Sequence, residues 1–170
     1  DAPKDYSLGE TIVTWTVADN YGNIVNASQT ITVVDTTNPR ILVSGDIIIE
    51  ASSMSENTIE LDVPRVIDNV EIILIENNAP EFFPLGETIV TWTVTDTSGN
   101  VSTAQQQISF QDTLQPSLSI PDNLLIEIND SSGMIVDIGV ASAIDIVEIN
   151  PQISNDAPEF FPLGETIVTW

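Results

Sequence analysis

Apolar and polar residues alternate along most of this chain, and a period of two predicts β-strands rather than helices. Residues 59–63 and 136–140 each carry branched apolar residues at every second position. Residues 90–95 place Val and Trp on one side of a strand and Thr on the other. A Thr-Ser-Gly-Asn turn at 97–100 then leads into a return strand over 101–110. No segment shows a convincing helical period, so we expect an all-β protein.

The chain also repeats itself at long range. The segment Gly-Glu-Thr-Ile-Val-Thr-Trp occurs three times, and its final residues Trp15, Trp92 and Trp170 are 77 and 78 residues apart. The 14 residues that end at Trp92 are identical to the 14 that end at Trp170. Self-similarity at a fixed period of this length is typical of tandem repeat proteins. We therefore expect the chain to be a window onto a longer tandem array.

Repeat boundaries are placed at the motif Asp-Thr-x-x-Pro, which occurs at 35–39 and 112–116, because the residue before a proline favours an extended conformation. This division predicts that residues 1–34 are the C-terminal part of a preceding repeat. Residues 35–111 form one complete repeat. Residues 112–170 form a following repeat that is truncated within a late strand.

Six or seven short strands per repeat, separated by Gly, Pro, Asn and Asp, predict tandem immunoglobulin-like β-sandwich domains. The three tryptophans share a strand face with valines, so we expect them in the core rather than on a sugar-binding surface. On the return strand, Ala104, Gln106, Ile108 and Phe110 are expected to face inward.

The amino-acid composition excludes several classes of function. The chain has 26 Asp and Glu against 3 Lys and Arg, a net charge of −23, and neither His nor Cys. Without these two residue types, imidazole and thiol catalysis are excluded, and we expect no enzyme. The negative charge disfavours nucleic acids and anionic membranes, and no apolar run is long enough to span a bilayer. Divalent cations are the expected partners.

Carboxylates are expected to gather at one pole of each repeat. In an immunoglobulin-like sandwich, the linker, the loop after the second strand and the final hairpin meet at the same end. Oxygen donors without nitrogen or sulfur suit Ca²⁺, which we predict as the cofactor. The candidate ligands are Asp35, Asp68, Asn69, Asp96 and Asn100, with the equivalent Asp112 and Asp145 in the following repeat and Asp19 and Asn23 in the preceding one.

The same residues have a simpler interpretation. An Asp at the start of a turn commonly accepts hydrogen bonds from backbone N–H groups two residues later, so turn capping and calcium binding both stay open. Three Asn-x-Ser/Thr sequons, at Asn26, Asn100 and Asn129, are candidate glycosylation sites. Their number is about what chance gives, and Asn129, in a polar loop, is the expected most accessible one.

The motifs taken together resemble those of a known family. Phe-Pro-Leu-Gly-Glu-Thr-x-Val-Thr-Trp-Thr-Val-x-Asp at 83–96, Ser-Gly-Asn at 98–100, Asp-Asn-Val at 68–70 and Asp-Thr-x-x-Pro at 112–116 resemble the hyalin repeat (HYR). The resemblance covers essentially the whole chain. It implies an immunoglobulin-like module of extracellular proteins, used for adhesion or surface architecture without catalysis. Many animal hyalin repeats have a cysteine pair that this chain lacks, which favours a prokaryotic, for example archaeal, cell-surface array.

These observations predict an extracellular structural repeat of a surface-layer, sheath or filament protein, stiffened by calcium between domains. Its partners are expected to be neighbouring copies in a lattice or fibre. The alternative is a stalk or binding module of a cell-surface adhesin. The second and third repeats differ most at 53–58 against 130–134 and at 72–77 against 149–155, and none of these stretches contains an aromatic residue. A structural role is therefore favoured over a recognition tip.

Overall fold

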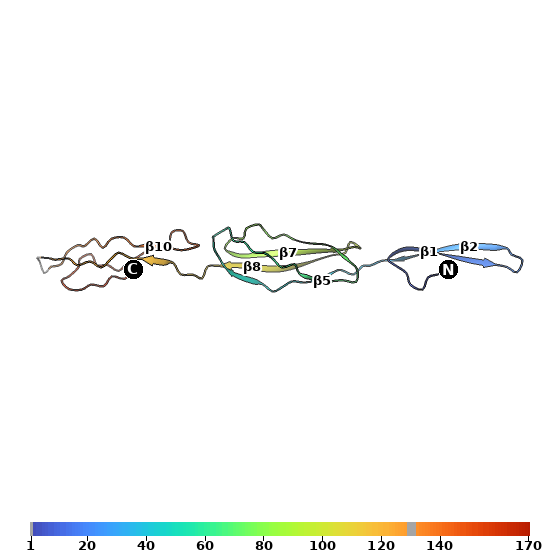
Figure 1. The fold of residues 1–170 in the computed structure, drawn as a ribbon, viewed down its shortest axis with the longest axis horizontal. Helices are drawn as coiled ribbons and strands as arrows, with labels where there is room; N and C mark the ends of the chain where they lie inside the picture. The colour runs from blue at the N-terminus through green and yellow to red at the C-terminus, as the bar shows by residue number, and fades with distance from the viewer. Residues whose placement is uncertain (1, 129–131) are drawn as a thin grey trace. The chain divides into compact units, whose positions relative to one another are not determined.

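A computed structural model describes residues 2–128 and 132–170, which form ten β-strands and no helix (Figure 1). The all-β fold class predicted from the sequence is therefore confirmed. Contacts divide the chain into two compact units, one made of Asp1–Asp46, Glu60–Ala79 and Ile89–Gln107 and the other of Ile47–Ile59, Pro80–Thr88 and Ile108–Trp170. The described residues include no helix long and apolar enough to cross a membrane.

The first two strands form a regular antiparallel hairpin. β1 (Gly9–Ala18) pairs with β2 (Ile24–Val33) from Gly9 opposite Val33 to Ala18 opposite Ile24. The turn between them contains Gly22, whose positive φ of 85° suits glycine. Trp15 is 56% exposed, so the expectation that all tryptophans are core residues is wrong here. The reason is that β1 and β2 form a two-stranded sheet by themselves.

The complete repeat contains six strands in two sheets. A short antiparallel pair joins β3 to β5, while the larger sheet has the order β4-β8-β7-β6, with β4 parallel to β8 and β6 antiparallel to β7. Figure 1 shows β7 and β8 side by side. This arrangement is the expected immunoglobulin-like sandwich. The strands are β3 (Arg40–Leu42), β4 (Ile47–Glu50), β5 (Arg65–Ile67), β6 (Ile72–Asn77), β7 (Gly86–Asp96) and β8 (Val101–Gln111).

The core follows the period of two along β7 and β8. Val90, Trp92 and Val94 are buried on β7, and Ile108 and Phe110 are buried on β8. Gln106 is buried in the same row, as expected, and its Oε1 accepts a hydrogen bond from Trp92 Nε1 at 3.2 Å. The tryptophan of the complete repeat is therefore a core residue with a satisfied polar atom.

One strand that the sequence predicts in each of two repeats is not present in the structure. Residues 59–63 and 136–140 alternate apolar and polar, yet neither stretch is a strand in the structure. Along 59–62 the side chains still alternate between partly buried and exposed, and Val63 is exposed. An extended segment can turn alternate side chains inward without ladder hydrogen bonds, and Pro64, which follows, has no N–H to donate. The alternation here reports burial and not strand pairing.

The following repeat reproduces the short elements of the complete one. β9 (Ser117–Ser119) pairs antiparallel with β10 (Ser142–Ile144), and these ranges lie exactly 77 residues after β3 and β5. The isolated bridge between Asn57 and Phe83 recurs between Met134 and Phe161. The long-range repetition in the sequence is thus also a repetition of structure.

Candidate metal site

Three carboxylates from distant parts of the chain meet in the complete repeat. Asp35 lies in the linker before β3, Asp68 follows β5, and Asp96 ends β7. One carboxylate oxygen from each lies within 4.8 Å of the other two. In the described part of the chain, this is the only group of three or more potential metal-ligating side chains that meet so closely. We refer to these residues as the Asp cluster.

Asp96 is fully buried and caps the β7–β8 turn. Its Oδ1 accepts hydrogen bonds from the backbone N–H groups of Ser98 and Asn100, both at 2.8 Å, and its Oδ2 accepts one from Asn100 Nδ2 at 2.8 Å. Asp96 has the strand parity of Trp92 and Val94, which explains why its side chain points inward. Asp96 therefore caps a turn, and it does so while its carboxylate lies close to those of Asp35 and Asp68.

Asp35 is held in place by donors from three segments. Its Oδ1 accepts hydrogen bonds from Thr37 N and Asn69 Nδ2, both at 3.0 Å, and its Oδ2 accepts one from Asn100 Nδ2 at 3.2 Å. The Thr37 backbone N–H and then the Asn69 amide hold the pKa of Asp35 below its ordinary value of 3.8. The linker carboxylate is thus ionised at neutral pH.

Asp68 differs from the other two. Both of its carboxylate oxygens are buried, and neither has a hydrogen-bond partner among the described residues. A buried carboxylate without hydrogen bonds or a counter-charge is unfavourable by several kcal/mol. Two unit charges within 4.8 Å of each other add a repulsion of roughly 3–4 kcal/mol at an effective dielectric constant of about 20. A cation among the three carboxylates would remove both penalties.

The donor set fits a hard cation. The Asp cluster offers only oxygen atoms, which Ca²⁺ prefers. Asn69 and Asn100, also predicted as ligands, turn their amide nitrogens toward Asp35 and Asp96. In this arrangement the two amides position the carboxylates. Ligation through their amide oxygens stays a prediction.

Asp19 and Asp145, the equivalents of Asp96 and Asp68 in the neighbouring repeats, act as turn caps. Asp19 Oδ1 accepts hydrogen bonds from the backbone N–H groups of Tyr21 and Asn23, both at 2.9 Å, and its Oδ2 accepts one from Asn23 Nδ2 at 2.7 Å. These bonds, the Asn23 side chain first, lower the pKa of Asp19. Asp145 accepts Glu148 N at 2.9 Å and Val147 N at 2.8 Å, which lower its pKa. Neither Asp19, Asp145 nor the exposed Asp112 joins a group of three among the described residues.

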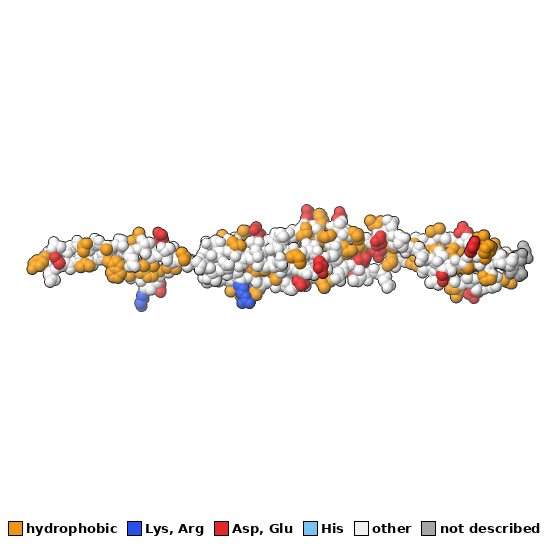
Figure 2. Space-filling model, turned by 180° about the vertical axis from the view of Figure 1, so that it is seen from behind, with side chains coloured by type: hydrophobic (Ala, Val, Ile, Leu, Met, Phe, Trp, Pro, Cys, Tyr) orange, Lys and Arg blue, Asp and Glu red, His pale blue; other side chains and the backbone are white. Residues whose placement is uncertain are grey.

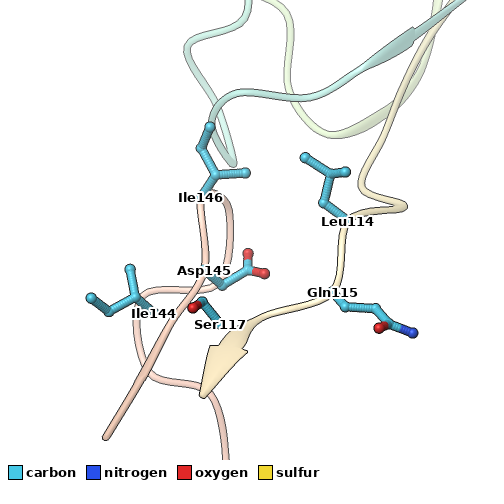
Figure 3. Close-up of a pocket in the computed structure, with 6 residues that line it drawn as sticks. All are labelled: Leu114, Gln115, Ser117, Ile144, Asp145 and Ile146. Atoms are coloured by element: carbon cyan, nitrogen blue, oxygen red, sulfur yellow. The ribbon is translucent and has the colours of Figure 1, made fainter. Parts of the chain in front are cut away.

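Asp145 also lines a pocket of about 500 Å³ beside the linker that follows β8. Figure 3 shows its carboxylate between Ile144 and Ile146 of its own segment and directed toward the side of the pocket formed by Leu114 and Gln115. The pocket has one charged group, so it offers a cation fewer ligands than the Asp cluster does. The structure therefore places the stronger candidate site in the complete repeat.

Sequence reasoning missed the partner of Glu50. At the end of β4, Glu50 Oε2 accepts a hydrogen bond from the Thr113 hydroxyl at 2.6 Å, and Oε1 accepts one from the Thr113 backbone N–H at 2.8 Å. The Thr113 hydroxyl and then its N–H lower the pKa of Glu50, while the charge of Asp145 opposes this shift. Thr113 belongs to the boundary motif Asp-Thr-x-x-Pro, and the recurrence of that motif was the available signal.

The three sequons differ in accessibility. Asn100 donates through Nδ2 to Asp96 and Asp35, so a glycan on this nitrogen would disrupt the Asp cluster, and the geometry argues against modification there. Asn26 lies exposed on β2. Asn129 lies outside the described residues. Glycosylation at Asn26 and Asn129 stays a prediction.

Comparisons with known proteins agree with the repeat motifs. Residues 34–110 match the family described as HYR domain. The chain is 35% identical over 184 aligned residues to "Hyalin" of Strongylocentrotus purpuratus, which covers 99% of this chain and 15% of that protein. It is 32% identical over 180 aligned residues to "Hyalin" of Lytechinus variegatus, which covers 97% of this chain and 34% of that protein.

The chain thus spans 15% and 34% of the lengths of these two relatives. No solved structure matches it. Both relatives are sea urchin proteins, so the comparisons give no support to the expected prokaryotic origin. Together with the all-β fold, the comparisons support the assignment of residues 34–110 as an HYR-type immunoglobulin-like repeat.

Proposed function

We propose that this chain is a segment of an extracellular, cell-surface structural protein, in which calcium stiffens tandem HYR-type repeats and neighbouring copies associate. The surface assembly is a layer, a sheath or a filament. One observation carries the calcium proposal: the buried, unpartnered carboxylate of Asp68 lies against Asp35 and Asp96. The relatedness to two proteins named hyalin supports the extracellular structural role.

The proposed mechanism follows from where each ligand sits in the chain. Asp35 belongs to the linker that enters the complete repeat, whereas Asp68 and Asp96 belong to loops of that repeat. A cation shared by all three would tie the linker to the body of the repeat and restrict its direction. Without the cation, mutual repulsion of the carboxylates loosens this attachment. The role is one of support, and no catalytic step is involved.

The expected affinity is low. Extracellular calcium-binding modules have dissociation constants of about 10⁻⁴–10⁻³ M, because they work where calcium is abundant. A site with three carboxylates and two supporting amides, in which Asp35 is partly exposed and water completes the coordination, fits that range. Free calcium at a hundred times the dissociation constant would stabilise the repeat by about 2.7 kcal/mol.

The experiment is a calcium titration of the 170-residue chain. Isothermal titration calorimetry should give one calcium ion per chain, and the melting temperature Tm should be higher in calcium than in chelator. Magnesium serves as the control, because its strict octahedral geometry and strong hydration should make it bind more weakly at such a site than calcium does. Identical melting curves in calcium and in chelator would contradict the proposal.

A further inference from the structure

The edge strand β6 exposes a continuous run of apolar side chains. Ile73, Leu74 and Ile75 are 63%, 45% and 38% exposed. Within the complete repeat, all of whose residues the structure describes, no other three consecutive large apolar side chains are exposed. Scattered single apolar residues on a surface are ordinary, but a continuous run on one strand indicates an interaction surface.

The backbone of β6 is open on one side. In the sheet order β4-β8-β7-β6, this strand pairs only with β7, with Leu74 opposite Thr95 and Ile75 opposite Val94. Natural edge strands are usually protected by Lys, Pro or a bulge. Residues 72–77 contain neither Lys nor Pro, and the one irregularity is confined to the start of the strand, between Ile72 and Leu74. The remainder of the edge can accept another strand.

The following repeat has a different sequence at the equivalent position. There the equivalent residues 149–154 read Ile-Asn-Pro-Gln-Ile-Ser, and Pro151 stands in the place of Leu74. This segment is not a strand in the structure. The apolar run at this edge is therefore not shared by the following repeat, and it lies in one of the stretches where the two repeats differ most.

We propose that β6 is a homotypic docking edge, which pairs antiparallel with β6 of a second copy of this chain. A register centred on Leu74 places Leu74 opposite its counterpart and Ile73 opposite Ile75 of the copy, so that all three exposed residues meet apolar partners. In this register Glu76 faces Ile72, and Glu71 faces Asn77. The register thus avoids opposing carboxylates in a chain of net charge −23. The proposal rests on the self-association part of the proposed function and is independent of calcium.

The contact must be weak, which suits an array. Two six-residue edges bury less than the roughly 1,200–2,000 Å² of a stable interface. One such contact per chain gives a transient dimer, while several contacts along an array of repeats raise the overall affinity without any new interaction. The chain itself should therefore be studied at high concentration and with its charges screened.

Sedimentation of the 170-residue chain from about 10 μM to about 1 mM, at about 0.15 M salt, tests the proposal. The wild-type chain should show a concentration-dependent dimer. Leu74→Lys should weaken the dimer at least tenfold. Ile89→Lys is the matched control, because Ile89 is similarly exposed at 48% but lies on β7, which is paired on both sides. A chain that stays monomeric throughout, or a Leu74→Lys variant that dimerises like wild type, would overturn the proposal.

A single cysteine tests the register. The chain has no cysteine, and residues directly opposite in an antiparallel pair have Cα atoms about 4.5–5.5 Å apart, within disulfide range. Leu74→Cys should therefore form a disulfide-linked dimer under mild oxidation, and Ile89→Cys should stay largely monomeric; equal dimer yields would contradict the register. The calcium-dependent Tm shift, measured on Leu74→Lys, should be that of wild type. A wild-type chain that stays monomeric but keeps its calcium-dependent Tm shift would thus refute only the β6 proposal, and a wild-type dimer without that shift would refute only calcium binding.

Discussion

At the scale of single residues, Asp68 decides between a calcium site and a set of turn caps. Asp96 and Asp35 accept hydrogen bonds from neighbouring donors, as turn caps do, but Asp68 accepts none from the described residues. A capping role therefore accounts for two of the three carboxylates. Under the proposed calcium binding, the third gains a partner when the cation binds, so removing its charge should have opposite effects with and without calcium.

Asp68→Asn should raise Tm slightly, or leave it unchanged, in chelator, because it removes one of three mutually repelling charges. In saturating calcium the same variant should melt roughly 10 °C below wild type, because the binding free energy is lost. Asp62→Asn, at an exposed acid outside the Asp cluster, is the matched control and should behave like wild type in both conditions. A Tm that falls equally in chelator and in calcium would mean that Asp68 is only a structural residue.

Glu50 provides a test of pH dependence. Its pKa is lowered from the ordinary 4.5 by hydrogen bonds from Thr113, so the folded chain binds this proton less readily than the unfolded chain does. The stabilisation is complete above pH 4.5 and is lost as the pH falls through the lower folded pKa. Glu50→Gln should therefore lower the urea midpoint modestly at pH 7, because the pair is exposed, and should have no effect in strong acid.

The control for this measurement is Glu60→Gln, since Glu60 is also an exposed acid but makes no contact with Thr113. It should leave the midpoint unchanged at both pH values. A Glu50→Gln effect of the same size at pH 7 and in strong acid would show that the Glu50–Thr113 contact does not depend on the carboxylate charge.

At the scale of elements, the β7–β8 hairpin and its counterpart β1–β2 make a natural comparison. Gln106 is buried and accepts a buried hydrogen bond from Trp92 Nε1, and it donates to Ser44 Oγ at 3.0 Å and Gly45 O at 3.1 Å, which belong to exposed residues. Gln106→Leu leaves the buried Trp92 donor unpaired, which costs roughly 1–3 kcal/mol, whereas water can reach the exposed Gly45 carbonyl. Thermal unfolding should therefore show a Tm lowered by at least about 4–8 °C.

Gln29 is the equivalent residue on β2, where both Gln29 and the equivalent tryptophan Trp15 are exposed, so water can replace any lost hydrogen bond. Gln29→Leu should change the Tm by less than about 2 °C, since exposed substitutions are usually within about 0.5 kcal/mol of neutral. Equal losses for the two variants would show that the buried network around Gln106 is not what stabilises the core of the complete repeat.

Sequence reasoning succeeded where one local pattern was sufficient. β7 and β8 were predictable because an apolar row with a period of two meets a Gly-Asn turn, and the inward parity of Asp96 followed from Trp92. The meeting of Asp35, Asp68 and Asp96 was predictable because the topology brings three loops to one end. Residues 59–63 were misjudged because alternation reports burial, whereas a strand also needs a partner with free backbone groups.

What the sequence could not give was the orientation of terminal polar atoms. Whether Asn69 and Asn100 turn oxygen or nitrogen toward a carboxylate depends on the relative placement of side chains from separate segments. The hydrogen bonds between Thr113 and Glu50 likewise join residues far apart in sequence. Both features depend on tertiary structure, so the local sequence around each residue does not predict them.

At the scale of the whole molecule, charge acts in two ways that can be separated. The complete repeat carries 12 acids and 2 arginines, and Figure 2 shows acidic side chains spread over the visible face with few basic ones among them. Diffuse repulsion of this kind is weakened by any salt, because the Debye length falls from about 30 Å at 0.01 M to about 10 Å at 0.1 M. The calcium site proposed in the Asp cluster, in contrast, takes one specific ion and should respond to ion identity.

Sodium chloride should therefore raise the Tm gradually, by a similar amount in wild type and in Asp68→Asn, because both share the diffuse charge. Calcium added at constant ionic strength should raise only the wild-type Tm, and it should saturate at millimolar concentration, as expected of one site. Differential scanning calorimetry across both series makes the comparison. If sodium and calcium at equal ionic strength gave equal shifts, screening alone would account for the stabilisation, and the calcium site in the Asp cluster would have to be abandoned.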